Sequence, residues 1–99
     1  MTALLRERAI ISLRSVPSLP KHVRIQFDPV RQAFAVLSPE KVFWPNDISL
    51  EILRRCDGRS DVGHIIADLA AEYGAAEDEI ASDVYAFLQE WADKLLVRL

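Results

Sequence analysis

Hydrophobic and polar residues change their period near the middle of the chain. From Val23 to Trp44 the apolar residues form short, strand-length segments, the first of which alternates with polar residues, whereas after Asp47 the apolar residues recur every three or four positions. Alternation predicts β-strands, and a repeat near 3.6 residues predicts helices. We therefore predict one α+β domain, a three-stranded antiparallel meander followed by three helices.

Three short apolar segments predict the strands. They run from Val23 to Phe27, from Ala33 to Leu37 and from Lys41 to Trp44. The links between them contain Asp28-Pro29 and Ser38-Pro39, and these residue types favour turns. Consecutive strands joined by short turns pair as an antiparallel meander.

The third segment has three apolar residues in succession. One buried face cannot cover Val42, Phe43 and Trp44 together, because successive strand residues point to opposite faces. Pro45 cannot donate a hydrogen bond to a ladder, so it ends the strand or confines it to an edge. Either both faces are covered, or one shows apolar surface to a partner. Trp44 fits a core position and a binding surface equally well.

Three apolar stripes predict the helices. The first helix follows the capping types Asn46 and Asp47 and ends before Gly58, which suits a left-handed position. The second begins at Ser60 or Asp61 and ends at Gly74. The stripes consist of Ile48, Ile52, Leu53 and Cys56, then Val62, Ile65, Ile66, Leu69, Ala70 and Tyr73, then Ile80, Val84, Phe87, Leu88, Trp91 and Leu95.

The first sixteen residues fit neither period. We predict a flexible N-terminal arm over residues 1–16, because chain ends are loose unless they are held. Pro17 and Pro20 then mark the start of a domain over residues 17–99. The alternative is an arm that docks on the sheet or on a partner.

Composition excludes several classes of protein. A single cysteine, Cys56, rules out an internal disulfide, and its stripe position predicts a buried thiol. His22 and His64 lack metal-ligand spacing, and no catalytic motif is present, so we expect no catalytic residue, metal or cofactor.

No apolar run approaches the roughly 20 residues of a membrane span, and no signal-peptide core follows the start. We expect a soluble cytoplasmic protein.

Charge is divided along the chain. Residues 1–32 carry six basic and two acidic residues, a net of +4, and the remainder carries six basic and thirteen acidic residues, a net of −7, giving −3 in total. A DNA-binding regulator is the main alternative function for a domain of this kind, but phosphate binding requires clustered Lys and Arg. The second and third predicted helices carry mostly acids, so the charge argues against nucleic acid as a partner.

The stretch from Pro39 to Gly58 resembles the PqqD-like family. The resemblance rests on Pro39-Glu40 before a short apolar strand, on Asn46, and on the sequence LEILRRCDG at residues 50–58; Asp83-Val84 and Phe87-Leu88 also fit. It extends from about Pro17 to Val97. Pro45 departs from the family pattern, in which an apolar residue such as Leu is expected.

This resemblance implies a function. The family consists of small peptide-binding proteins of pyrroloquinoline quinone biosynthesis, related to the domains that recognise leader peptides, with a winged helix-turn-helix-like arrangement. It implies a non-catalytic chaperone that binds the ribosomal precursor peptide. The chaperone then presents this peptide to a radical S-adenosylmethionine enzyme, which joins a Glu to a Tyr.

We predict that the peptide adds to the third strand, since strand edges accept extended peptides. The resemblance places the other wall of the groove on the third helix. Leu88 is expected to line the groove, and Phe87 to face the core. The predicted peptide-binding residues are Lys41, Val42, Phe43, Trp44, Asp83, Tyr85 and Leu88.

Overall fold

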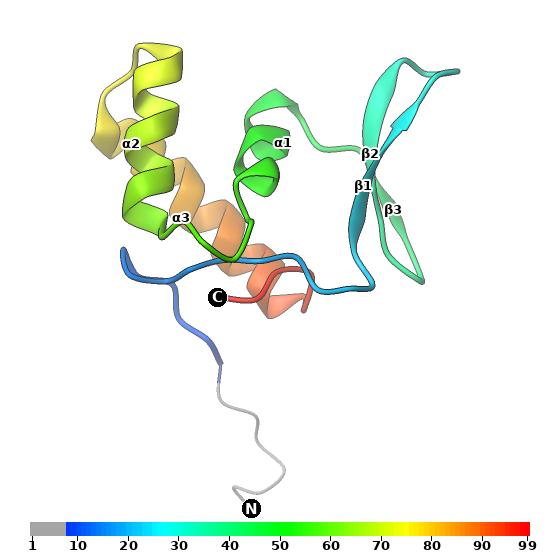
Figure 1. The fold of residues 1–99 in the computed structure, drawn as a ribbon, viewed down its shortest axis with the longest axis horizontal. Helices are drawn as coiled ribbons and strands as arrows, with labels where there is room; N and C mark the ends of the chain where they lie inside the picture. The colour runs from blue at the N-terminus through cyan, green and yellow to red at the C-terminus, as the bar shows by residue number, and fades with distance from the viewer. Residues whose placement is uncertain (1–7) are drawn as a thin grey trace, which may run out of the picture.

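The computed structural model describes residues 8–99 and contains a three-stranded sheet followed by three helices (Figure 1). The strands are β1 (Arg24–Asp28), β2 (Ala33–Leu37) and β3 (Val42–Phe43), and they pair antiparallel in the order β1-β2-β3. The helices are α1 (Asp47–Arg54), α2 (Val62–Tyr73) and α3 (Glu77–Asp93). The predicted α+β fold and its meander are confirmed, with a third strand shorter than the predicted four residues.

The two faces of the sheet have different surroundings. The register aligns Ile25, Val36 and Phe43 across the three strands, and these side chains join the hydrophobic core. Because strand side chains alternate, Arg24, Leu37 and Val42 lie on the opposite face. We call this opposite side the outer face of the sheet.

The helix ends follow from the capping residues. Asn46 Oδ1 accepts a hydrogen bond from the Ser49 N–H at 2.9 Å, and Asp61 Oδ1 accepts one from the His64 N–H at 2.7 Å. Gly74 ends α2 with φ 59°, a left-handed conformation that glycine adopts without steric cost. The prediction for Leu95 is wrong. Helix α3 ends at Asp93, and Leu95 has φ 62° and an exposed side chain, because the chain turns there to bury the next two residues.

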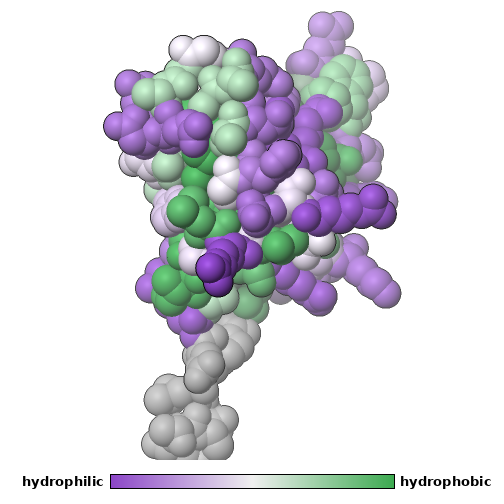
Figure 2. All heavy atoms as spheres, turned by 60° about the vertical axis from the view of Figure 1, so that its left-hand side comes forward, coloured by the Kyte–Doolittle hydropathy of each residue, from purple (hydrophilic) through white to green (hydrophobic). Residues whose placement is uncertain are grey.

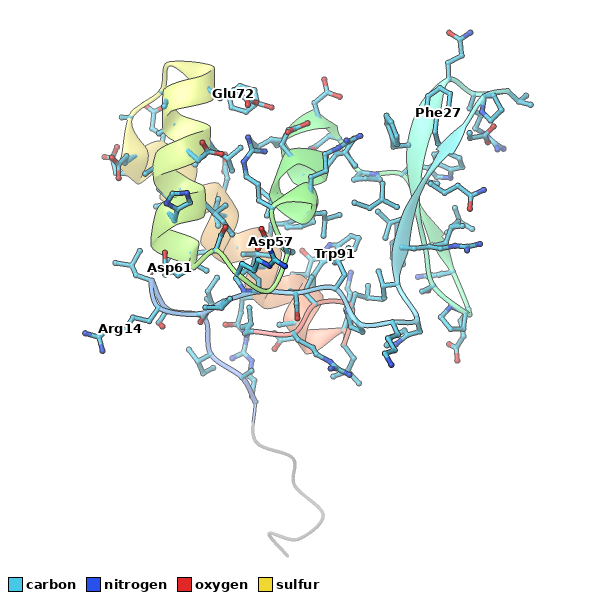
Figure 3. All side chains as sticks on the ribbon, in the orientation of Figure 1. Arg14, Phe27, Asp57, Asp61, Glu72 and Trp91 are labelled. Carbon is cyan, nitrogen blue, oxygen red and sulfur yellow. The ribbon has the colours of Figure 1, made fainter. Side chains whose placement is uncertain are left out.

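The core is built chiefly from the helical stripes. Trp91 lies between the helices and the sheet (Figure 3), and its ring centroid is 5.1 Å from that of Phe43. The fully buried large side chains include Val36 from the sheet and Ile52, Leu53, Ile65, Leu69, Val84 and Leu88 from the helices. The sheet therefore contributes one face to a core that the helices largely supply.

The described N-terminal segment, residues 8–18, lies against the helical side of the fold. The carbonyls of Ser15 and Leu13 accept hydrogen bonds from the Val62 and Gly63 N–H groups at 2.8 and 3.0 Å. These bonds satisfy first-turn donors of α2 that have no partner within the helix. Ser18 pairs with Arg98 through two backbone bonds of 2.8 Å, so the beginning and end of the described chain run side by side (Figure 1).

Helix α3 holds the start of this segment. The Gln89 amide accepts from the Ile11 N–H at 2.9 Å and donates to the Ala9 carbonyl at 2.8 Å, and Arg8 forms two bonds of 2.7 and 2.8 Å with Asp93. The hydrogen bond and charge of Arg8 lower the pKa of the Asp93 carboxyl. Residues 1–7 of the predicted flexible arm lie outside the described residues, and the mobility of the arm stays a prediction.

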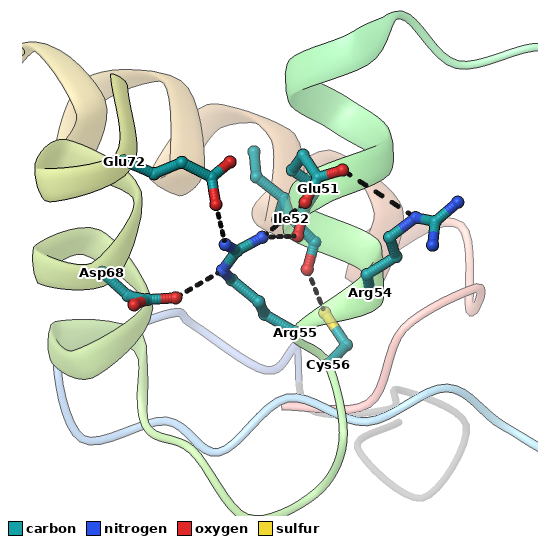
Figure 4. A network of polar contacts seen from close by, with 7 residues as sticks. All are labelled: Glu51, Ile52, Arg54, Arg55, Cys56, Asp68 and Glu72. Atoms are coloured by element: carbon teal, nitrogen blue, oxygen red, sulfur yellow. Dashed lines mark hydrogen bonds and ion pairs between the residues drawn. The ribbon is translucent and has the colours of Figure 1, made fainter. Parts of the chain in front are cut away.

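A network of ion pairs joins α1 to α2 (Figure 4). The Arg55 guanidinium contacts Glu51 and Asp68 at 2.8 Å each and Glu72 at 3.0 Å, and only 19% of its side chain is exposed. Burial opposes the charge on Arg55, but the hydrogen bonds to Asp68 and Glu51 outweigh it and raise its pKa. Arg55 thus fixes the short α1, which follows directly from β3, against α2.

Candidate functional site

The outer edge of β3 has no strand beside it among residues 8–99, because β3 pairs only with β2. The Ser38 N–H donates to the Lys41 carbonyl at 2.9 Å, which makes these two residues a hydrogen-bonded pair. Pairs alternate along an antiparallel ladder, so Leu37–Val42 is a non-hydrogen-bonded pair and Val36–Phe43 is a bonded one. The backbone N–H and C=O of Val42 therefore point away from β2, toward the free edge.

An aromatic row connects β3 to α3. The rings of Phe43 and Trp91 are 5.1 Å apart between centroids, and those of Trp91 and Phe87 are 4.9 Å apart. Trp91 is buried, whereas Phe43 and Phe87 remain partly exposed. Tilted aromatic pairs at this separation attract one another beyond simple burial. The row gives the space beside the β3 edge an apolar lining.

The face of α3 on this side is set by the helical repeat. Asp83, Phe87 and Trp91 follow at intervals of four residues and share a face. Asp83 is exposed and lies one helical turn before Phe87, on the part of α3 farther from the sheet. The structure therefore places Asp83 on the same helix face as the aromatic row.

Two predicted residues on α3 lie elsewhere. Leu88 has no exposed surface and packs in the core, while Phe87 is half-buried, which reverses the orientation that the sequence predicted. Tyr85 lies on the other flank of α3, where it lines a hollow with Leu13 and Ala81. The physical reason is the phase of the helix, since a residue next to Phe87 or two before it cannot share its face. The four-residue spacing of Asp83, Phe87 and Trp91 is the sequence signal that places Phe87 on the same helix face as Trp91.

Basic residues flank the end of β3. Lys41 lines a hollow with Phe43 and Leu96, and Lys94 enters the same hollow from just beyond α3. Lys94 Nζ pairs with Glu90 at 2.8 Å, and Lys41 Nζ lies 5.8 Å from the centre of the Phe43 ring. The hollow combines an apolar lining with two ammonium groups and the Glu40 carboxylate, and the sequence prediction does not include Lys94.

The outer face of the sheet displays Val42 and Trp44, whose side chains are 50% and 45% exposed. Arg31 lies over the Trp44 ring at 4.8 Å from its centre. The four predicted residues on the third strand therefore divide between two sides. Phe43 lies on the helix side, and Val42 and Trp44 lie on the outer face, although Val42 also offers its backbone to the edge.

The thiol of Cys56 lies in the core and away from the β3 edge strand's exposed residues. Cys56, the one thiol, is buried, and burial raises its pKa to about 12, far from the range in which a thiolate nucleophile forms at neutral pH. Within residues 8–99 no group of three His, Cys, Asp or Glu side chains is arranged to hold a metal ion. None of the helices in this part of the chain has the length and apolar character needed to cross a membrane. Figure 2 shows the side that carries α2, where hydrophilic side chains cover much of the surface.

Comparison with known proteins identifies similar sequences. Residues 34–97 match the family model described as coenzyme PQQ synthesis protein D (PqqD). A PqqA binding protein from Rhodopseudomonas palustris (strain BisB5) is 48% identical over 84 residues, which cover 85% of this chain and 82% of that protein. A PqqA binding protein from Gluconobacter oxydans (strain 621H) is 39% identical over 86% of this chain and 88% of its own length.

Two solved structures have the same fold. One is the solution structure of the PqqD truncation of Methylobacterium extorquens PqqCD, described as a functional, stand-alone recognition element for ribosomally synthesised and modified peptides. It has a TM-score of 0.79 and 33% identity over 95% of this chain and all of that chain. The other is the crystal structure of PqqD from Xanthomonas campestris, with a TM-score of 0.58 and 38% identity over 90% of this chain and 99% of that chain.

Proposed function

This chain belongs to the PqqD family, and we propose from that premise that it binds the PqqA precursor peptide as an added strand on β3. Relatives 48% identical to it are named for binding PqqA, and the Methylobacterium structure is described as a peptide recognition element. The observation that carries the proposal is the edge of β3, which no strand among residues 8–99 pairs with, and where the Val42 N–H and C=O are directed outward beside the aromatic row.

Backbone hydrogen bonds to Val42 supply attachment that does not depend on the peptide's sequence. In strand addition the backbone provides affinity, and pockets for alternate side chains provide specificity. Peptide side chains on the helix side meet Phe43, Phe87 and the exposed carboxylate of Asp83. Those on the outer side meet Val42 and Trp44.

The exposed Asp83 carboxylate at one end of this groove orients the peptide. Lys41 and Lys94 lie where α3 ends, and Asp83 lies on the preceding part of the helix. A basic peptide residue is favoured near Asp83, whereas Glu40 and Glu90 balance the charge of the two lysines at the other end. Tyr85 and Leu88 contribute indirectly, because they hold α3 in the orientation that presents Phe87.

The protein does no chemistry in this account. Binding holds the peptide at a fixed place and raises its effective concentration for a radical S-adenosylmethionine enzyme, which performs the Glu–Tyr cross-link. The resemblance to the family supports this enzyme as the second partner, and it supports action in the cytoplasm. Ordering a disordered peptide costs about 2–5 kcal/mol, which the apolar contacts must offset.

Calorimetric titration with synthetic PqqA tests the proposal. We expect binding by the wild type and loss of binding by Val42→Pro, which removes the outward N–H without breaking a bond to β2. Glu77→Pro is the matched control, because Glu77 is the first residue of α3, where proline is tolerated, and it lies away from β3. Circular dichroism verifies that both variants fold. Equal PqqA affinity in folded Val42→Pro and wild type contradicts strand addition at β3.

A further inference from the structure

We infer that residues 8–15, which we call the strap, set the position of α3 relative to β3 and thereby the affinity of the peptide groove, with Gln89 as the positioning residue. The inference rests on the proposed function, because the groove lies between the β3 edge and α3. It adds to that function a control of the peptide site by a part of the chain that does not touch the peptide.

The strap and the groove lie on opposite flanks of α3. Each residue turns a helix by about 100°, so Gln89 lies about 200° round the helix from Phe87. Asp93 follows Gln89 by four residues and shares its flank, whereas Trp91 shares the flank of Phe87. The fully buried Leu88 points to the core between the two flanks. A change in the contacts on the strap flank therefore moves the groove flank relative to β3.

Directional polar contacts hold the strap flank. The Gln89 side-chain amide accepts from the Ile11 N–H at 2.9 Å and donates to the Ala9 carbonyl at 2.8 Å. Asp93 adds the two bonds of 2.8 and 2.7 Å from the Arg8 guanidinium. Hydrogen bonds weaken steeply when their length or angle departs from the preferred values. These four bonds therefore fix the distance between α3 and the strap backbone.

The groove flank is held by apolar packing instead. Trp91 packs on Phe43 and Phe87 packs on Trp91, with ring centroids 5.1 and 4.9 Å apart. Within residues 8–99 no hydrogen bond or ion pair joins α3 to any of the three strands. Apolar attraction is non-directional, so the ring contacts tolerate small shifts of α3 that the bonds to the strap oppose. Of the two flanks, the strap flank thus defines where Phe87 lies.

The other end of the strap is anchored on α2. The Leu13 and Ser15 carbonyls accept from the Gly63 and Val62 N–H groups at 3.0 and 2.8 Å. Figure 1 shows the strap beside α2, with the sheet at the opposite side of the molecule. Because the strap is bonded to two helices, it can transmit a fixed spacing to α3 without contacting β3.

The contacts between the strap and α3 are concentrated at one end of this helix. All hydrogen bonds from the strap to α3 in the described chain go to Gln89 and Asp93. Beside the first part of α3 lies a hollow of about 600 Å³, lined by Leu13, Asp78, Ala81, Ser82, Tyr85 and Ala86. The hollow leaves the first part of α3 room to move on the strap flank, so its orientation depends on the bonds at Gln89 and Asp93.

Calorimetric titration with synthetic PqqA tests the positioning role. Gln89→Leu removes both bonds to the strap backbone and introduces a residue of similar size that suits a helix. We expect PqqA affinity to fall about fivefold, the low end of the coupling found between two places in one protein. Arg55→Met is the matched control, because it breaks the network between α1 and α2 without touching the strap, and it should leave PqqA affinity unchanged. Circular dichroism verifies that both variants fold.

Amide hydrogen exchange of the wild type is a second measurement that needs no variant. Coupling between two sites is reciprocal, so a strap that strengthens peptide binding is itself held more firmly when the peptide is bound. The Ile11 N–H, which donates to Gln89, should exchange about fivefold more slowly with saturating PqqA. The His64 N–H is the control, since it donates to the Asp61 carboxylate and not to the strap.

Several results overturn the inference. Folded Gln89→Leu with wild-type PqqA affinity does so, as does an Ile11 exchange rate that PqqA leaves unchanged. An equal loss of PqqA affinity in Arg55→Met also does so, because the effect then comes from general stability. If Gln89→Leu does not fold, the Ile11 exchange rate decides alone. Wild-type protein that does not bind PqqA overturns the proposed function and this inference together, whereas the other results overturn the inference alone.

Discussion

The sheet and the helical layer of this small domain treat apolar residues in opposite ways. Helices α1, α2 and α3 bury their stripes and expose one large apolar side chain, Tyr73. The strands and the turns next to them expose Phe27, Val30, Val42 and Trp44 over a far shorter length of chain. The difference fits the proposed function, in which the helices stabilise the fold and the sheet offers surface to the peptide.

Charge and polar contacts follow the same division. Residues 62–93 carry eight acids and no Lys or Arg, whereas residues 21–44 have a net charge of +2 from four basic and two acidic residues. Arg55 joins α1 to α2 through three carboxylates, and no comparable network ties the sheet to the helices among residues 8–99. Changes in the helical core should therefore affect stability, and changes on the sheet should affect binding.

The largest effect is expected at Leu53. This α1 side chain is fully buried, so Leu53→Ala should lower the free energy of unfolding by about 2–5 kcal/mol through lost burial and a cavity. Urea denaturation measures the change. Val42→Ala is the matched change on the sheet, and its half-exposed side chain predicts a much smaller loss. Equal losses in the two variants contradict the division between core and surface.

Arg55 tests the polar part of the helical layer. Arg55→Met keeps much of the apolar stem and removes the three ion pairs, so we expect the free energy of unfolding to fall by about 1–3 kcal/mol, between values for exposed and buried pairs. Lys94→Met is the control, because its single pair with Glu90 is exposed. If the two substitutions have the same effect, the Arg55 network does not stabilise the α1–α2 contact.

Phe87 and Leu88 are neighbours that should give opposite results. Phe87→Ala should weaken PqqA binding about tenfold while the protein stays folded, because Phe87 is a half-buried aromatic residue on the groove face. Leu88→Ala should chiefly lower the denaturation midpoint, since Leu88 is in the core. Calorimetry and denaturation of both variants measure this. A folded Leu88→Ala with the larger loss of PqqA affinity restores the original sequence prediction.

The smallest expected effect is the alkylation of the Cys56 thiol in the native protein. The thiol is buried, donates to the Ile52 carbonyl at 3.3 Å and has a pKa raised to about 12 by burial and by Asp57, so native protein at pH 8 should not react with iodoacetamide. Mass spectrometry detects alkylation, and the same protein in urea is the positive control. Rapid alkylation without urea means that the α1 end of the core opens readily.

The sequence predicted the element order because the change from alternation to helical spacing is a local signal. Asn46, Asp61 and Gly74 cap helices as their types suggest. Contacts between distant residues carry no such signal. The Gln89 amide that binds the backbone of residues 9–11, and the carbonyls of Ser15 and Leu13 that cap α2, depend on how two remote segments meet.

The candidate site was predicted in part. Val42–Phe43 was identifiable as an edge strand because of its short apolar run and Pro45. The side of α3 that faces the β3 edge could not be identified from the sequence. Its six apolar residues over sixteen positions fit two neighbouring rotations of the helix, and the wrong rotation exchanges the buried position of Leu88 with the groove position of Phe87. The direction of the Val42 backbone required the ladder register, which the Ser38–Lys41 bond sets.

The two edges of the sheet provide the most direct test of strand addition at β3. In the alternating ladder, the Ile25 N–H points out from β1 as the Val42 N–H points out from β3. Amide hydrogen exchange followed by NMR, with and without saturating PqqA, compares these two groups in one sample. The account predicts strong protection of the Val42 amide on binding, shifts at Lys41–Trp44, Asp83 and Phe87, and an unchanged Ile25 amide. Protection of Ile25 instead, or changes confined to α2, would contradict it.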